Sequence, residues 1–191
     1  MAWKSHGLRG SDLEERVNYT IGQYRKNGLA VIQKVPTPIT PVQLDGKGHI
    51  TLAYFEQKST VDYIGAVQGI PVCFDAKESK TDTFPLANIH EHQITFMKDF
   101  ERQGGISFFL VYFSTRAEYY YLSLDEAERY WSRMKEGGRK SFRYDELDPA
   151  HFLSEARNGE ITILDGVNVY LQELDSRKEQ EAGCSAERPS K

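Results

Sequence analysis

Cysteine is scarce in this 191-residue chain, which has Cys73 and Cys184 but no Cys-x-x-Cys pair. Because Cys73 lies in an apolar run and Cys184 in a polar tail, we expect no disulfide and a reducing, cytoplasmic environment. Long apolar runs are also missing, since the longest, at 106–113, is far shorter than the about 20 residues that cross a bilayer. The N-terminus lacks the apolar segment of a signal peptide, so we expect no membrane association.

Positive charge is not in excess, because 24 Lys and Arg against 28 Asp and Glu give a net charge of −4. This excludes a uniformly basic nucleic-acid coat, although a local basic face remains open. The sequence has no GxxxxGK[ST], GxGxxG or GxSxG motif, so NTP hydrolysis, dinucleotide redox and esterase chemistry have no support. Hydrophobic residues make up 39% of the chain, which is enough for the core of about one domain of roughly 150 residues.

The hydrophobic pattern switches between helical and strand periods, which predicts a mixed α/β layer fold. A capping box at Ser11–Glu14 begins a first helix that ends at Gly28. Further strands are predicted at 29–34, twice within 62–77, at 106–114, at 118–124 and at 161–164, with helices near 86–103, 123–137 and 167–175. We expect a flexible arm at 1–10, one domain over 11–174, and a disordered tail at 175–191, which has no large apolar residue.

A projecting hairpin is predicted at about 36–58. Pro36, Pro38 and Pro41 are too closely spaced for a central strand. The turn signal Asp45-Gly46 is then followed by the extended segment 48–55.

Two acids and an amine form the pattern that carries chemistry. Strand alternation places Val72, Phe74 and Ala76 on one face of a strand, and Cys73, Asp75 and Lys77 on the other. Asp62, on the preceding strand, can come alongside this second face. Two converging carboxylates suit Mg²⁺, and a nearby lysine can stabilise charge on a phosphate, as phosphodiester hydrolysis requires. The alternative is an ordinary surface ion pair, and the spacing alone leaves both open.

Several sequence blocks occur in an order that resembles one family. They are VPTPI at 35–39, AYFEQKSTVDY at 53–63, FDAKE at 74–78, FPL at 84–86, HEHQ at 90–93 and GRKSFRYDEL at 138–147. This series is similar to the RecU Holliday junction resolvase family, also called penicillin-binding protein-related factor A, over roughly residues 8–174. The family belongs to the PD-(D/E)xK nucleases. The resemblance implies a restriction-endonuclease-like core, a mixed β-sheet flanked by helices, with the 36–58 hairpin as a protruding stalk that enters a junction.

The resemblance also implies a set of site residues. Asp62 and Asp75 would hold Mg²⁺, with Mn²⁺ able to substitute, and Lys77 would act at the transition state. Thr60 and Gln93 match further positions of the family's metal site, and Gln93 belongs to the implied catalytic set. Asp75 stands where the family usually has Glu, so the metal geometry can shift. Glu14 is either a further acid near this cleft or only part of the capping box.

Contacts with DNA phosphates are predicted where cations cluster. Five cations and one acid lie within 133–143, a local charge of +4 in an acidic protein. We interpret Arg139, Lys140 and Arg143 as DNA contacts, together with Arg9 of the arm and the stalk residues Lys47 and Lys58. The alternative is a solvated helix end whose cations are favoured by the helix dipole.

Two other motifs have simpler interpretations. His90 and His92, if both are helical, point to nearly opposite sides and cannot bind one zinc ion together. Tyr119, Tyr120 and Tyr121 are expected mostly to pack in the core rather than to stack on bases.

From the resemblance and the acid pair, the predicted function is a Mg²⁺-dependent crossover junction endodeoxyribonuclease. It would resolve four-way junctions by paired symmetric nicks during recombination and repair. The implied partners are junction DNA, a second copy in a homodimer, and recombination proteins such as a recombinase or a branch-migration helicase. Two alternatives remain: a duplex-specific restriction or repair nuclease, and a non-catalytic DNA-binding recombination modulator.

Overall fold

The computed structural model describes residues 12–55 and 60–186, so the predicted arm at 1–10 lies outside the described residues. Its helices are α1 (Asp12–Lys26), α2 (Glu91–Arg102), α3 (Leu124–Lys135) and α4 (Ile163–Ala186). Its strands are β1 (Ala30–Lys34), β2 (Ile39–Leu44), β3 (Ile50–Phe55), β4 (Tyr63–Val67), β5 (Ile70–Ser79), β6 (Thr83–Pro85), β7 (Ile106–Phe113), β8 (Glu118–Ser123), β9 (Ser141–Arg143) and β10 (Phe152–Leu153).

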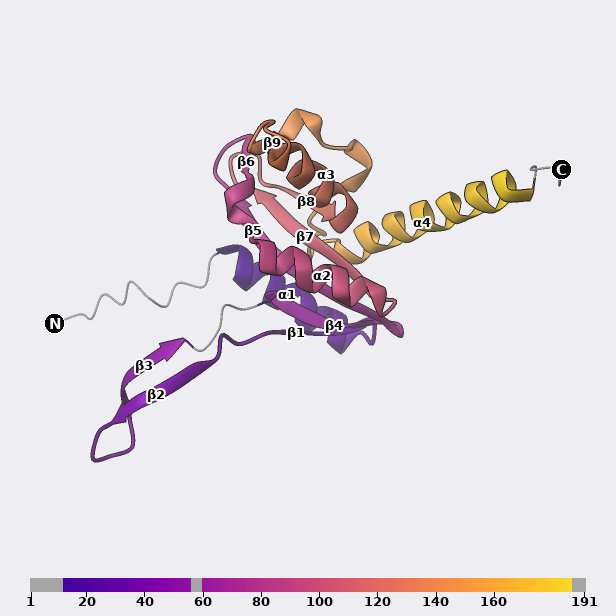
Figure 1. The fold of residues 1–191 in the computed structure, drawn as a ribbon. Coiled ribbons are helices and arrows are strands. Elements are labelled where there is room, and N and C mark those ends of the chain that lie inside the picture. The colour runs from indigo at the N-terminus through magenta and orange to yellow at the C-terminus, as the bar shows by residue number, and fades with distance from the viewer. Residues whose placement is uncertain (1–11, 56–59, 187–191) are drawn as a thin grey trace.

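A six-stranded mixed sheet in the order β1-β4-β5-β7-β8-β10 forms the centre of the molecule (Figure 1). The neighbours β5 and β7 are parallel, whereas the other pairs are antiparallel. Parallel neighbours need a long crossover, and α2 lies in the connection from β5 to β7. This arrangement confirms the predicted mixed sheet flanked by helices.

The sheet is covered by helices on both faces, with a separate hydrophobic cluster on each side. Val72 and Phe74 of β5 pack in the cluster that contains the apolar residues of α1 and α4. Cys73 of the same strand belongs to the other cluster, with residues of α2 and α3. The alternation predicted for β5 is therefore present, but its second face is covered rather than solvated.

Aromatic rings stack across four neighbouring strands and hold the middle of the sheet together. Ring centroids lie 4.7 Å apart for Tyr63 and Phe74, 4.8 Å for Phe74 and Phe108, and 4.4 Å for Phe108 and Tyr121. Such pairs contribute about 0.5–1.5 kcal/mol each beyond their area burial. Tyr119, Tyr120 and Tyr121 are all buried, which confirms that they pack in the core.

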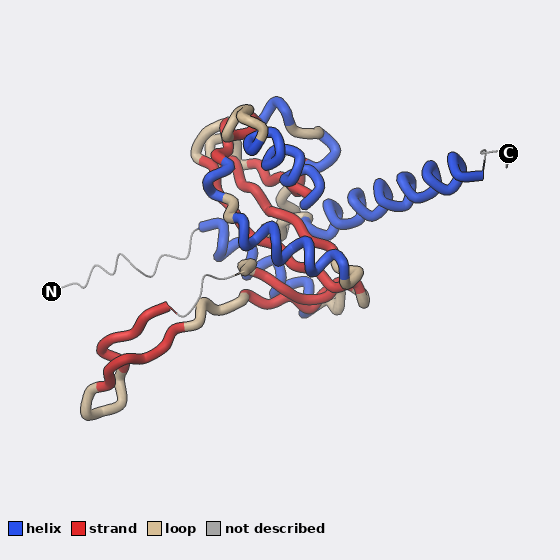
Figure 2. Tube along the Cα trace, viewed as in Figure 1, coloured by secondary structure: helices blue, strands red, loops and turns tan. Residues whose placement is uncertain are grey.

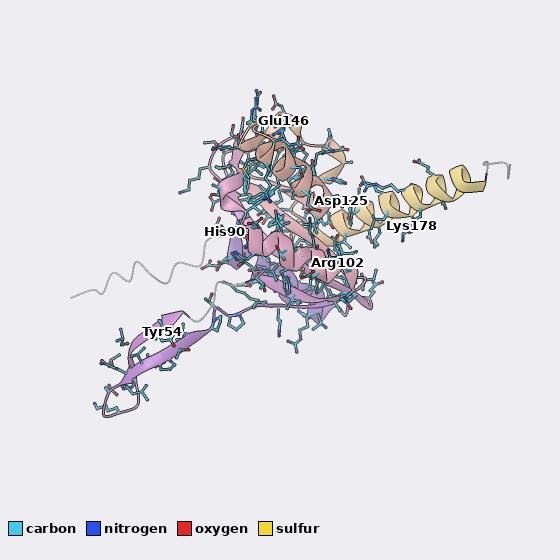
Figure 3. All side chains as sticks on the ribbon, in the orientation of Figure 1. Tyr54, His90, Arg102, Asp125, Glu146 and Lys178 are labelled. Carbon is cyan, nitrogen blue, oxygen red and sulfur yellow. The ribbon has the colours of Figure 1, made fainter. Side chains whose placement is uncertain are left out.

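The stalk consists of β2 and β3, which pair with each other and form a two-stranded sheet apart from the central one. Figures 1 and 2 show this hairpin projecting away from the body. Its large side chains are exposed on both strands, namely those of Ile39, Val42, Leu44, Ile50, Leu52 and Tyr54. Figure 3 shows Tyr54 well away from the helices of the body.

The ends of two helices differ from the sequence prediction. α2 begins at Glu91 rather than near residue 86, because β6 and a 3-10 turn at Leu86–Asn88 come first. α4 continues from Ile163 to Ala186, whereas we predicted a short strand at 161–164 and disorder from residue 175. The residues after 175 include Glu, Lys, Gln and Ala, which favour a helix by propensity even without an apolar face. In the described part of the chain, no helix is both long and apolar enough to span a membrane.

Gly65 tests how closely β1 and β4 pack. A Cβ at this position would lie 2.1 Å from Val31 O and 2.6 Å from Ile32 Cα, and backbone atoms cannot move aside as a flexible side chain can. We expect Gly65→Ala to lower the free energy of unfolding in urea by about 1–3 kcal/mol, as overpacking does. The matched control is Gly22→Ala in α1, where nothing lies within 4 Å and alanine should stabilise by roughly 0.5–1 kcal/mol. Equal stability of the two variants would contradict this packing.

Candidate active site

The strand pairing brings the two predicted acids together. Tyr63 of β4 is opposite Phe74 of β5 in the antiparallel register. Asp62 immediately precedes Tyr63 and Asp75 immediately follows Phe74, so the two acids occupy neighbouring positions on adjacent strands. Asp62 Oδ2 also accepts a hydrogen bond of 3.1 Å from the backbone N–H of Ala76. The pattern proposed from the sequence is thus present as a geometric cluster.

Asp75 is the centre of this cluster and is completely buried. Its Oδ1 atom lies 2.6 Å from Lys77 Nζ, and its Oδ2 atom accepts a hydrogen bond from Gln93 Nε2. The Lys77 side chain keeps 18% of its surface exposed, so the ammonium group lies between the buried carboxylate and solvent. Because Asp75 is completely buried, this contact is not an ordinary surface ion pair.

The surroundings of Asp75 change its acidity. Burial raises the pKa of its carboxyl group from 3.8 to about 7, because the charged form loses hydration. The Lys77 ammonium opposes this rise in the pKa, and the neighbouring Asp62 carboxylate adds to it. A bound cation would favour the charged form of both acids.

Gln93 is positioned by the start of α2. The helix follows His90, its N-cap, and Gln93 is the third helical residue, the position from which a side chain reaches back to the cap. Gln93 Oε1 accepts a hydrogen bond of 3.1 Å from the backbone N–H of His90. The other end of the amide contacts Asp75, so this one side chain joins α2 to β5.

Thr60 and Glu14 lie at the edge of the cluster. Thr60 is exposed and two residues before Asp62. Glu14 Oε2 lies 2.5 Å from Lys34 Nζ. Burial is the main cause that raises the pKa of the Tyr63 hydroxyl, and the charges of Glu14, Asp62 and Asp75 raise this pKa further. Glu14 therefore lies close to the two acids of the cluster. The predicted cap at Ser11 lies outside the described residues. No sequence pattern indicates Lys34, because its pairing with Glu14 depends on the fold.

The donor set of the cluster fits a hard divalent cation. Among the described residues, no group of three or more His, Cys, Asp or Glu side chains could hold a metal ion. Mg²⁺ commonly binds through only one or two carboxylates, with water and phosphate oxygens completing its shell. Asp75 Oδ1 is buried, and its polar partner among the described residues is the Lys77 ammonium group, 2.6 Å away. Such an oxygen, beside a second carboxylate, suits a hard cation such as Mg²⁺.

The predicted basic segment is largely neutralised. Arg133 and Arg139 both pair with Glu146, at 3.2 and 3.3 Å, and Arg143 pairs with Asp145. Lys135 Nζ pairs with Glu91 at 3.0 Å. Lys140 is exposed and has no ion pair with any described residue, and Lys47 is exposed at the tip of the stalk. The predicted contacts Arg9 and Lys58 lie outside the described residues.

The helical geometry predicted for the pair His90 and His92 is wrong, because α2 begins only at Glu91. His90 has an extended backbone as the N-cap of α2, so it does not point away from His92 as a helical residue would. The two rings stack with their centroids 5.4 Å apart. Figure 3 shows His90 at the start of α2.

The comparisons with known proteins identify the family of this chain. A model of the family "RecU: Recombination protein U" matches residues 8–169. This chain belongs to the RecU family. A Holliday junction resolvase RecU from Bacillus pumilus is 45% identical over 154 residues, which cover 78% of this chain and 74% of the relative. The RecU resolvase of Leuconostoc mesenteroides is 40% identical over 174 residues, covering 88% and 84%.

Solved structures show a weaker similarity to this RecU chain. The Archaeoglobus fulgidus Holliday junction resolvase Hjc aligns with a TM-score of 0.35 and 12% sequence identity, covering 60% of this chain and 75% of that one.

The raised pKa of Asp75 predicts how the stability of the metal-free protein depends on pH. Because the folded state holds the proton more tightly than the unfolded state, stability falls as pH rises from 3.8 toward about 7. Asp75→Asn cannot ionise at this position, so the variant should lack this part of the decline. Thermal unfolding of both proteins in a chelator, from pH 4 to 8, measures the difference. Parallel stability curves would contradict the assigned environment.

Proposed function

We propose that this RecU-family protein is a Holliday junction resolvase, a Mg²⁺-dependent endonuclease that makes paired symmetric nicks in four-way DNA junctions during recombination and repair. The observation that carries the proposal is the buried Asp75 carboxylate, held between Lys77 and Gln93 and flanked by Asp62. The curated relatives are named for junction resolution, and they align over most of both chains.

Each residue of the cluster has a chemical part in phosphodiester hydrolysis. Asp62 and Asp75 would hold Mg²⁺, or Mn²⁺ in its place. The bound ion would neutralise charge on the phosphate oxygens. Lys77 is partly exposed beside Asp75, so its ammonium group can contact a phosphate oxygen and stabilise the charge that develops there. Thr60, two residues before Asp62, would be a further residue of this metal site, as the family resemblance implies.

Resolution of a junction requires two cuts, and each chain has one such cluster. A homodimer with twofold symmetry would place two equivalent sites on the two opposing strands. The stalk projects from the body and carries Lys47 at its tip, which suits insertion into the open centre of a junction. Recombination proteins such as a recombinase or a branch-migration helicase remain proposed partners.

DNA phosphates would be held mainly by electrostatic contacts. Lys47 and Lys140 have exposed side chains that are available for phosphates. Arg139 and Arg143 would first exchange their carboxylate partners, Glu146 and Asp145, for phosphate oxygens. Binding of this kind weakens steeply with rising salt, because counterions are released from the DNA.

Lys77→Ala tests the proposed chemistry. Removing the ammonium group should reduce junction cleavage in Mg²⁺ by about 10²–10³-fold, the usual effect of deleting one charge-stabilising group. Junction binding in a gel-shift assay should remain, because the other cations are intact. The control is Lys26→Ala, an exposed lysine in the last turn of α1, which should cleave at the wild-type rate. Wild-type cleavage by the Lys77 variant would refute the assigned role.

The two alternative functions are separated with the wild-type protein. A mobile junction competes against linear duplex of the same sequence, with and without Mg²⁺. We expect preferential cleavage of the junction and no nicks in a chelator. Equal cleavage of the duplex would favour a restriction or repair nuclease. Metal-independent junction binding without nicks at any Mg²⁺ concentration would favour a recombination modulator.

A further inference from the structure

The amide group of Gln93 is engaged at both of its ends. The backbone N–H of His90 can only donate, so the atom facing it must be the amide oxygen, at 3.1 Å. The amide nitrogen is then left to face Asp75 Oδ2, which accepts its hydrogen bond. The partners therefore fix the orientation of the amide, and the side chain is itself buried.

This arrangement disagrees with the role that the family resemblance implied for Gln93. A glutamine binds a hard cation through its oxygen, not through its nitrogen. To bring this oxygen to a cation held by Asp75, Gln93 would have to turn its nitrogen away from Asp75, and the same turn would carry the oxygen away from the N–H of His90. Both displaced groups would lose a hydrogen bond, and the buried Asp75 Oδ2 would lose its donor.

We propose that Gln93 is a positioning residue that orients the Asp75 carboxylate from the helix cap and does not itself bind the metal. The bond to Oδ2 leaves Oδ1, which lies 2.6 Å from Lys77 Nζ, directed to the lysine and to the cation. This inference rests on the proposed metal-dependent function. The first turn of α2 would then hold the Asp75 side chain of β5 in place, as hydrogen-bond partners orient metal ligands in other proteins.

Two substitutions of Gln93 separate a positioning role from a metal-binding role. One supplies a metal ligand without a hydrogen-bond donor, and the other supplies neither. Gln93→Glu replaces the donor with a carboxylate, which is a good ligand but repels Asp75. Gln93→Met keeps the length and has neither a donor nor a hard ligand. If Gln93 positions Asp75, both variants should bind Mn²⁺ in calorimetry about 10-fold or more weakly than wild type. If Gln93 is a ligand, Gln93→Glu should bind Mn²⁺ as tightly as wild type or more tightly, which would overturn the proposal.

The control for added charge is Gln103→Glu at the other end of α2, where the side chain is exposed. It should bind Mn²⁺ like the wild type. Circular dichroism and thermal unfolding identify any variant that fails to fold.

A second measurement needs no variant. Solvent exchange of the His90 backbone amide is followed by NMR in the wild-type protein, with and without Mg²⁺. A positioning role keeps Gln93 Oε1 on this N–H, so its exchange rate should stay within about twofold when Mg²⁺ is added. Metal ligation by a turned Gln93 amide would remove the acceptor, and a large acceleration by Mg²⁺ would overturn the proposal.

These readouts are independent of the cleavage assay. If the wild type binds Mn²⁺ but cuts no junction, the proposed function fails while the role of Gln93 is still measured. If the wild type cuts junctions and Gln93→Glu retains full Mn²⁺ affinity, only the positioning role fails.

Discussion

The burial of the Asp75 carboxylate against the central β-sheet is the constraint on which the rest of this structure depends. Asp75 lies on a strand that is covered by helices on both faces, where an unpaired charge is strongly unfavourable. Lys77 from the same strand and Gln93 from α2 supply the contacts that allow it to remain there. Burial raises the pKa of this carboxyl group to about 7, and a bound cation would lower the pKa again.

The rigidity needed around this carboxylate comes from the sheet and not from loops. The ring stack from Tyr63 through Phe74 and Phe108 to Tyr121 crosses β4, β5, β7 and β8. Phe74 is the neighbour of Asp75 in the chain, so the stack fixes the backbone on which the acid lies. Side chains on such elements keep their geometry more accurately than side chains on mobile segments.

Much of the site could be predicted because its central residues follow local rules. Period-two alternation separated Val72 and Phe74 from Asp75, and short spacing predicted that Asp62 would lie on the adjacent strand. The complete burial of Asp75 could not be predicted, since it depends on α2 and on strands distant in sequence. The ion pairs of the basic segment were not predicted either: Arg139 and Arg143 pair with Glu146 and Asp145 a few residues further on, whereas Lys135 pairs with Glu91, more than forty residues away.

The errors at helix ends have a local cause. The sequence pattern predicts a helical backbone at His90. As the N-cap of α2, His90 instead has an extended backbone, and its ring points in a different direction from the ring of a helical residue. The tail after residue 175 was judged by its lack of apolar residues, although its composition also favours helix formation. The hydrophobic pattern alone locates buried helices well. It is a poor guide to the residue at which a capped helix begins and to helical segments that have no apolar face.

The stalk has a consequence for how this protein can diversify. Its two strands add no hydrogen bonds to the ladder of the central sheet, and its apolar side chains contribute little to either buried cluster. Mutations in the hairpin are therefore free of the packing constraints that govern the body. The length and charge of this ribbon can therefore change during evolution while the buried acid cluster of the body stays the same.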